Sequence, residues 1–205
     1  MIESYQSLAA PFRFEMDKVK GSRFIADVAP ATSEDEAKAF LESIRSEFHD
    51  ARHHCSAWRL GMRGETFKWS DDGEPSGSAG KPILAQLTGR ELVDVVGVVT
   101  RWFGGTKLGV GGLVRAYGGA LGLALDEAPI VTHELRRTFD LVFAYDGSSA
   151  VNAILHAWEL VPTESDYGEN VRLRVELPVA RAEAFQAEVV ERTGGKVVTL
   201  EIESA

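Results

Sequence analysis

Three basic side chains fall in the longest interval of this 205-residue sequence that contains no acidic residue. Within residues 95–125 the charged positions are Arg101, Lys107 and Arg115, whereas the whole chain has a formal net charge of −9. An overall negative charge gives a protein no help in approaching a polyanion, so contact with nucleic acid has to use a local basic patch. We therefore take these three residues as candidates for binding a phosphate or a carboxylate.

A glycine-rich loop lies between these cations. It joins an apolar strand expected at 92–100 to a helix expected at 112–125, and Gly104 and Gly105 are the first of its five glycines. Glycine lets backbone N–H groups approach a ligand, and a helix N-terminus adds partial positive charge. The pattern favours an anion site, with a purely structural role for the glycines as the alternative. The spacing fits neither a P-loop nor a Rossmann fingerprint.

Further polar residues lie upstream of this loop. Lys81 is expected to bring a fourth positive charge near the site. Asp71 and Asp72 belong to residues 70–77, a stretch rich in Asp, Gly, Pro and Ser that predicts turns. We expect these two carboxylates to serve in a turn or helix cap, or as ion-pair partners of the cations. Acid/base catalysis or help in binding a hard cation is the alternative, although such a cation needs more oxygen ligands.

His53, His54 and Cys55 follow one another on an expected strand. Side chains alternate along a strand, so His53 and Cys55 share one face and His54 points to the other. Cys55 is the only cysteine and no second Cys/His cluster completes a zinc site. The expectation is a buried cysteine rather than a nucleophile. His53 is retained as a supporting residue of the anion site, and no catalytic residue, metal or cofactor is predicted.

Composition indicates a folded, cytoplasmic protein. Hydrophobic residues make up 44% and charged residues 26% of the chain, as in ordinary globular domains. No apolar run approaches the roughly 20 residues that a membrane helix needs, so no membrane partner is expected. The acidic start at residues 1–4 lacks the features of a secretion signal, and a lone cysteine suits a reducing compartment.

The element pattern predicts an α+β protein with two domains, residues 1–132 and 133–205, joined by a linker at Pro129 and the segment after it. In the first domain, Ser33 and Glu36 have the spacing of a capping box that opens a helix. Strands are expected at 12–14, 24–28, between 54 and 69 and at 92–100, with helices after Ser33, at 79–87 and at 112–125.

The second domain shows a clearer order. Its residues alternate between strand and helix periodicity in the sequence βαββαβ, which is the ferredoxin-like split motif. The expected strands lie at 139–143, 160–167, 171–177 and 198–202. The helices are expected after Ser148 or Ser149 and across 182–189, the second one stopping at Gly194.

Four sequence blocks resemble the signatures of the YigZ/IMPACT family. The two long blocks are DDGEPSGSAGKP at residues 71–82 and VTRWFGGTKLGVGGLVRAY at residues 99–117. Shorter matches are KGSRF at 20–24 and ARHHC at 51–55, where His54 stands in place of the usual asparagine. The resemblance identifies the chain as a bacterial two-domain member of that family.

The resemblance carries expectations about fold and function. It implies an N-terminal domain like the second domain of ribosomal protein S5, followed by an additional ferredoxin-like module, a tandem similar to the last two domains of elongation factor G. Eukaryotic relatives regulate translation through the pathway that controls an initiation-factor kinase, whereas bacterial members have no settled activity. The implied role is contact with RNA or the ribosome.

Three functions follow as hypotheses. The first is a non-enzymatic regulator of translation that binds RNA or the ribosome through the glycine-rich basic site. The second is an enzyme that acts there on a small phosphorylated or carboxylated metabolite. The third is a protein-docking module, because residues 133–205 hold 7 basic against 13 acidic side chains and suit a basic partner.

Overall fold

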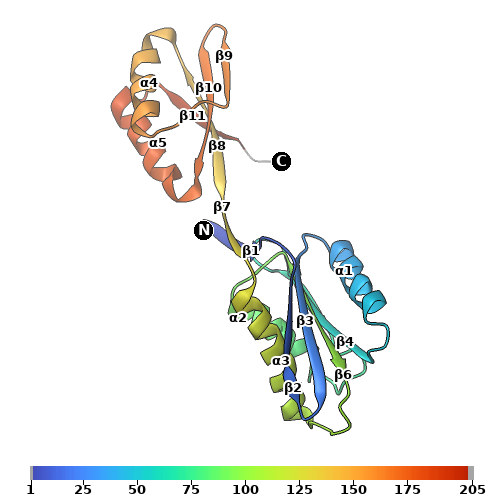
Figure 1. The fold of residues 1–205 in the computed structure, drawn as a ribbon. Coiled ribbons are helices and arrows are strands. Elements are labelled where there is room, and N and C mark those ends of the chain that lie inside the picture. Colours follow the sequence, from blue (N-terminus) through green and yellow to red (C-terminus); the bar gives the residue numbers. More distant parts are fainter. Residues whose placement is uncertain (1, 203–205) are drawn as a thin grey trace. The chain divides into compact units, whose positions relative to one another are not determined.

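The computed structural model describes residues 2–202, and contacts within it define two compact units (Figure 1). The larger unit comprises Tyr5–His133. The smaller unit begins at Glu134 and includes the N-terminal residues up to Ser4. Each unit combines helices with its own antiparallel sheet, which confirms the predicted α+β class with two domains.

The larger unit is built on a five-stranded antiparallel sheet with the order β2-β3-β6-β4-β5. Its central strand, β6, is the nearly continuous apolar and β-branched run predicted from the sequence, and it is buried along almost its whole length. The strands are β2 (Phe12–Val19), β3 (Ser22–Pro30), β4 (His53–Leu60), β5 (Thr66–Ser70) and β6 (Val95–Trp102).

Helices cover both faces of this sheet. Helix α1 (Glu34–Glu47) packs on one face, whereas α2 (Gly80–Gly89) and α3 (Val110–Glu127) pack on the other (Figure 1). The predicted capping box opens α1, because the Ser33 side chain accepts a hydrogen bond from the Glu36 backbone N–H at 3.2 Å. Apolar residues on each helix therefore bury against a sheet that is apolar on both sides.

The crossover from β3 through α1 to β4 leaves room for β6 between the two strands. Both β3 and β4 run antiparallel to β6, so the end of β6 lies beside their beginnings. In this register Arg101 on β6 is opposite Phe24 on one side and His53 on the other. Residues far apart in the sequence thus meet at one end of the sheet.

The segment predicted as a linker is instead a strand. β7 (Ile130–Glu134) pairs with β1 (Ser4–Leu8) in a separate two-stranded sheet. Next to this pair, the Ala9 backbone N–H donates to the Pro129 carbonyl at 2.8 Å. The two strands come from opposite ends of the larger unit's sequence, and such a distant pairing leaves no local signal in the sequence.

The smaller unit has the predicted ferredoxin-like topology. Its strand order, β11-β8-β10-β9, is the 4-1-3-2 arrangement of a βαββαβ chain, and every neighbouring pair is antiparallel. The last helix stops at Gly194 in the left-handed conformation, as expected. The elements are β8 (Arg136–Phe143), α4 (Ser148–Ala157), β9 (Glu164–Tyr167), β10 (Val171–Pro178), α5 (Val179–Thr193) and β11 (Val198–Ile202), with a short 3₁₀ turn at Tyr145–Gly147.

A contact between two glycines joins the β2–β3 turn to the loop after β6. A Cβ atom built on Gly104 would lie 1.9 Å from the Gly21 carbonyl carbon and 2.2 Å from the Ser22 nitrogen. No real Cβ tolerates such distances from backbone atoms. The glycine at position 104 is therefore required by packing, whatever else the loop does.

We predict that Gly104→Ala lowers the free energy of unfolding by at least about 1–3 kcal/mol, because the new methyl group forces two backbone segments apart. Chemical denaturation measures this change. The matched control is Gly119→Ala on α3, where an added Cβ meets no atom within 4 Å. That variant should gain up to about 1 kcal/mol from helix propensity. Equal free energies of unfolding for Gly104→Ala and Gly119→Ala would contradict the packing argument.

Candidate functional site

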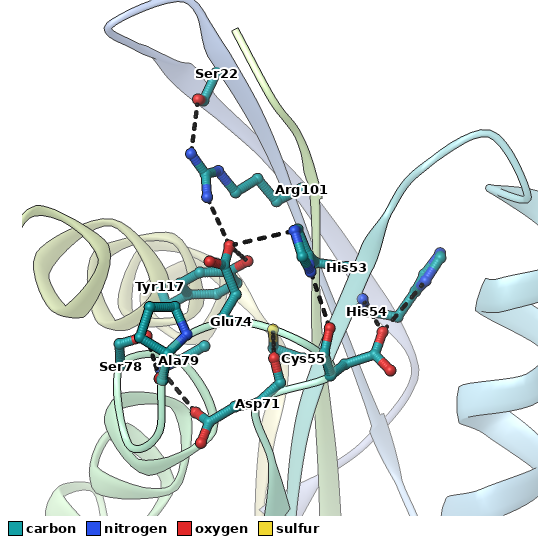
Figure 2. A network of polar contacts seen from close by, with 12 residues as sticks. Ser22, His53, His54, Cys55, Asp71, Glu74, Ser78, Ala79, Arg101 and Tyr117 are labelled. Carbon is teal, nitrogen blue, oxygen red and sulfur yellow. Dashed lines mark hydrogen bonds and ion pairs between the residues drawn. The ribbon is translucent and has the colours of Figure 1, made fainter. Parts of the chain in front are cut away.

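A buried ion pair forms the floor of the region that contains the glycine-rich loop (Figure 2). The Arg101 guanidinium donates from Nη1 to Glu74 Oε1 at 2.6 Å, and the two side chains are only 6% and 5% exposed. Arg101 comes from β6, whereas Glu74 comes from the loop between β5 and α2. Removing both charges from water is costly, so the pair requires further hydrogen bonds to be stable.

Those further contacts come from three other elements. Tyr117 on α3 donates its hydroxyl to the same Glu74 oxygen at 2.7 Å, and His53 Nε2 on β4 lies 4.0 Å from it. On the other side, Arg101 Nη2 donates to Ser22 Oγ at 3.2 Å. Figure 2 shows Arg101, Tyr117 and His53 converging on the Glu74 carboxylate. This network connects three strands, a helix and a loop.

Ser22 carries the network into the glycine-rich loop. Its hydroxyl oxygen accepts the Arg101 bond and also a bond from the Gly104 backbone N–H at 3.2 Å. The start of the loop is therefore fixed both by packing on Gly21 and by this hydrogen bond. The Arg101–Glu74 ion pair and the start of the glycine-rich loop are thus linked through Ser22.

Asp71 is a helix cap, as the sequence suggested. One carboxylate oxygen accepts from the Ala79 and Gly80 backbone N–H groups at 3.0 and 2.9 Å, and the other accepts from Gly77 at 2.7 Å. These are the free amides at the start of α2 and in the turn before it. Both oxygens are thus engaged in structure, which leaves Asp71 no free carboxylate oxygen for the acid/base alternative.

Asp72 is an ion-pair and turn residue. Its carboxylate accepts from Arg45 Nη2 at 3.0 Å and from the His54 backbone N–H at 2.7 Å. Its backbone carbonyl contacts His53 Nδ1 at 2.9 Å. The predicted ion pair is present, but its partner is on α1 rather than among the cations of the glycine-rich loop.

The predicted alternation at His53, His54 and Cys55 is confirmed. His53 and Cys55 face the Glu74 side, while His54 Nε2 contacts the Phe48 carbonyl at the end of α1. Cys55 is fully buried, and its thiol donates to the Asp71 carbonyl at 3.0 Å. Burial raises the pKa of the Cys55 thiol well above its ordinary value, so the nucleophilic thiolate is strongly disfavoured.

Burial affects the pKa of the Tyr117 phenol in the same direction as that of the Cys55 thiol. Burial raises the pKa of its phenol far above the ordinary value, and its contacts with Cys55 and Glu74 raise it further. The hydroxyl therefore remains a proton donor to Glu74. Neither buried group suits attack on a substrate.

A surface pocket of about 340 Å³ opens above the ion pair. Two cations line it, Arg101 in the floor and Lys107 on the glycine-rich loop. The first turn of α3 forms one wall, and Gly109 precedes that turn with a positive φ of 73°. The full lining is Glu74, Pro75, Arg101, Phe103, Lys107, Leu108, Gly109, Val110 and Leu113.

A second pocket of about 200 Å³ lies on the other side of Leu108, which lines both. Its two cations are Arg115 on α3 and Lys20 in the β2–β3 turn, and it also includes Gly112. The lining of this pocket contains no acidic side chain. Positive charge thus flanks the N-terminal turn of α3 on both sides.

The four predicted cations do not gather in one pocket. Arg101 and Lys107 share the larger pocket, Arg115 lines the smaller one, and Lys81 lines neither. The Lys81 ammonium instead lies 5.3 Å from the Trp69 ring centroid. Arg101 is paired with Glu74, a carboxylate other than the two proposed from the sequence as partners of the cations.

Sequence reasoning missed Lys20, Ser22, Glu74 and Tyr117. Lys20 belongs to a turn at one end of the chain, and only the crossover topology brings that turn beside α3. Glu74 was part of an acidic cluster in which its neighbours were the more obvious choices. The available signal was position, because Glu74 and Tyr117 lie inside the two long blocks at 71–82 and 99–117, and Lys20 and Ser22 lie inside the shorter block at 20–24.

We predict that Glu74→Gln lowers the free energy of unfolding by about 3–5 kcal/mol, since it leaves the Arg101 charge buried without a counter-ion. Denaturant titration measures the loss. Glu15→Gln is the control, because Glu15 pairs with Arg23 at a site where its side chain is 51% exposed. That variant should lose no more than about 1 kcal/mol. Similar small losses in both would show that the buried pair is not a stabilising link.

A pH dependence is expected from His54. Burial lowers the pKa of its ring below the ordinary value of about 6.5, so the unfolded chain binds this proton more readily than the folded one. The contribution of His54 to stability is complete above pH 6.5 and is lost as the pH falls towards its folded pKa. The free energy of unfolding should therefore drop between pH 7.5 and 5 by more in the parent protein than in His54→Asn. A match between the pH dependence of the parent protein and that of His54→Asn would refute the assignment.

Two negative findings apply to residues 2–202. No group of three or more His, Cys, Asp or Glu side chains in that range is placed to hold a metal ion. Within the same range, none of the helices has the length and apolar character needed to cross a bilayer.

Comparisons with known proteins agree with the two units. The family model described as the Impact N-terminal domain matches residues 20–125, and a domain of unknown function, DUF1949, matches residues 141–196. The chain is 40% identical to the IMPACT family member YigZ of Escherichia coli (strain K12) over 98% of its own length and 100% of the relative's. It is 35% identical to the IMPACT family member YvyE of Bacillus subtilis (strain 168), over 96% of this chain and 90% of that protein.

A solved crystal structure of a protein described only as hypothetical has the same architecture. It is 38% identical in sequence, aligns over the whole of both chains and gives a TM-score of 0.64. Sequence blocks, domain order and overall identity agree, and the resemblance seen in the sequence is confirmed. The chain belongs to the IMPACT family, with the two-domain organisation of its bacterial relatives YigZ and YvyE.

Proposed function

We propose that this protein binds the phosphate backbone of RNA over the N-terminal turn of α3 and acts without catalysis in translation. The observation that carries the proposal is the pair of adjacent pockets, each with an exposed cation, on the two sides of Leu108. A small metabolite is usually enclosed by one concave site. Two neighbouring positive pockets suit a ligand with repeated negative charges.

Exposed cations supply the charge for this contact. Lys20, Lys107 and Arg115 are all exposed, and no carboxylate of residues 2–202 forms an ion pair with any of them. Their charge is therefore available to phosphates, unlike that of Arg101. Phosphate contacts by exposed basic side chains, together with release of counter-ions, account for most sequence-independent affinity for nucleic acid.

The start of α3 adds backbone donors between the cations. Its first turn has free N–H groups, and no side chain caps it within the described part of the chain. Gly111 in that turn has open space where a Cβ would lie, with only Arg115 Nη1 nearby at 3.8 Å. Packing therefore does not require glycine there. Its absence of a side chain suits close approach by a phosphate.

The link to translation rests on the family. Eukaryotic members are expected to regulate translation, and the fold of the larger unit is expected to be like a ribosomal protein domain. One fold hosts many functions, whereas a binding site is defined by its own charges and geometry. We therefore base the test on RNA binding, which follows from the charges and geometry of this chain.

A second candidate, an enzyme acting on a small phosphorylated or carboxylated metabolite, is favoured by one observation. Glu74 lines the larger pocket and places a carboxylate beside Arg101 and within 4.0 Å of His53 Nε2. The acid/base candidates predicted from the sequence, Asp71 and Asp72, are engaged elsewhere. The protein-docking role of the acidic smaller unit stays a prediction, with a pull-down by that unit as its test.

We predict that the protein binds a 12-nucleotide single-stranded RNA with an affinity that falls steeply with salt. Contact with about three phosphates gives a slope of log K against log salt of about −2. Lys20→Ala, Lys107→Ala and Arg115→Ala should each weaken binding and make the slope shallower by about 0.7. Fluorescence anisotropy between 50 and 300 mM salt measures both quantities.

The control variant is Lys196→Ala, which removes one exposed positive charge from the smaller unit and should leave the slope unchanged. Salt-independent binding, or equal effects of all four variants, would contradict the proposed site. Absence of RNA binding together with saturable binding of a phosphorylated metabolite would instead support the enzyme.

A further inference from the structure

We infer that the larger pocket takes one unstacked base of single-stranded RNA, which stacks on Phe103, while the neighbouring phosphates bind on both sides of Leu108. This inference rests on the proposed function and narrows it from RNA in general to single strands. It starts from a feature that phosphate binding does not explain, which is the apolar character of the pocket.

Apolar side chains dominate the upper part of the pocket. Phe103 is 50% exposed and Val110 is 57% exposed, and Leu108 and Leu113 complete the apolar lining. A pocket that bound phosphate alone would be lined by donors and cations. An exposed aromatic ring beside cations is the arrangement that proteins use to bind the face of a base.

The ring is held by the buried ion pair. The Arg101 guanidinium carbon lies 5.6 Å from the Phe103 ring centroid, and Arg101 is itself fixed by Glu74 and Ser22. A cation at this distance is attracted to the ring. Phe103 thus has a rigid partner within the protein and keeps half of its surface for a ligand.

Arg101 contributes its charge to the lining of this pocket rather than a hydrogen bond to the ligand. The side chain is 6% exposed, and its Nε is buried without a hydrogen-bond partner in the described part of the chain. Because that nitrogen has almost no accessible surface, a base in the pocket contacts the Phe103 ring rather than this donor.

The positive groups surround the apolar pocket in a way that fits a nucleotide chain. Lys107 and the first amides of α3 border the pocket itself, and Lys20 with Arg115 follows beyond Leu108. A base in the larger pocket would place its own phosphate towards α3. The next phosphate along the strand would reach the smaller pocket.

This arrangement favours single-stranded RNA over an RNA duplex. Bases in an A-form helix are stacked and paired, so none of them can enter a side pocket, and recognition of duplexes uses their shape and backbone. A base that is free to leave the stack occurs in single strands, loops and ends. The predicted ligand class is therefore single-stranded RNA with little preference for sequence, because every base has a face that can stack.

The test compares Phe103→Leu with Phe67→Leu in the full-length protein. Phe67 on β5 is 59% exposed and lines neither pocket, so its substitution is the same chemical change at a neutral position. The probes are a 12-nucleotide oligouridylate and a 12-base-pair RNA duplex, measured by fluorescence anisotropy. Denaturant titration confirms that both variants are folded.

We expect the parent protein to bind the single strand more tightly than the duplex. Phe103→Leu should weaken single-strand binding about tenfold, within the range that loss of one stacking contact gives, and leave the salt slope unchanged. Phe103→Trp should keep or improve affinity, and Phe67→Leu should match the parent.

Failure of the inference is distinguishable from failure of the proposed function. Equal binding of duplex and single strand, or equal affinities for Phe103→Leu and Phe67→Leu, overturns the base pocket while salt-dependent RNA binding still stands. If neither RNA binds the parent protein, the proposed function fails and the base pocket fails with it.

Discussion

The Arg101–Glu74 contact is the interaction on which the arrangement of this site depends. An ion pair with both side chains almost fully buried has a large desolvation cost, which only close geometry and additional hydrogen bonds offset. Tyr117 and Ser22 provide those bonds, and each comes from a different element. The loop that carries Glu74, the end of β6 and the middle of α3 are consequently linked through the Glu74 carboxylate.

Because of this ion pair, the cation that stabilises the structure of the site is a different residue from the cations proposed to bind a ligand. Arg101 is the most obvious cation in the sequence, but its counter-ion lies inside the protein. Lys107, Arg115 and Lys20 carry exposed charges on backbone that the buried pair positions. Such a division is physically reasonable, because a free buried cation is unstable without its ligand, whereas exposed cations remain solvated until a phosphate arrives.

The sequence predicted those features that have a local physical signal. The capping residues Ser33 and Glu36, the β-branched run of β6 and the βαββαβ periodicity each depend on neighbours within a few residues, and the structure confirms them. The β1–β7 pair depends on topology, so no local pattern revealed it. Lys20 belongs to the sequence block at 20–24, but its position beside α3 also depends on topology. Glu74 was visible as an acidic residue, but its role depends on a partner 27 positions away.

The glycines illustrate why a motif alone does not define a binding site. Gly104 is required because another backbone occupies the space of its side chain, whereas the same space beside Gly111 is open. Both look alike in the sequence, and only the second leaves room for a ligand. Since the open position lies in the helix turn between two cationic pockets, the absent side chain and the exposed charges point to the same surface. A ligand that extends across Leu108 uses all of these features, and one confined to a single pocket leaves half of them unexplained.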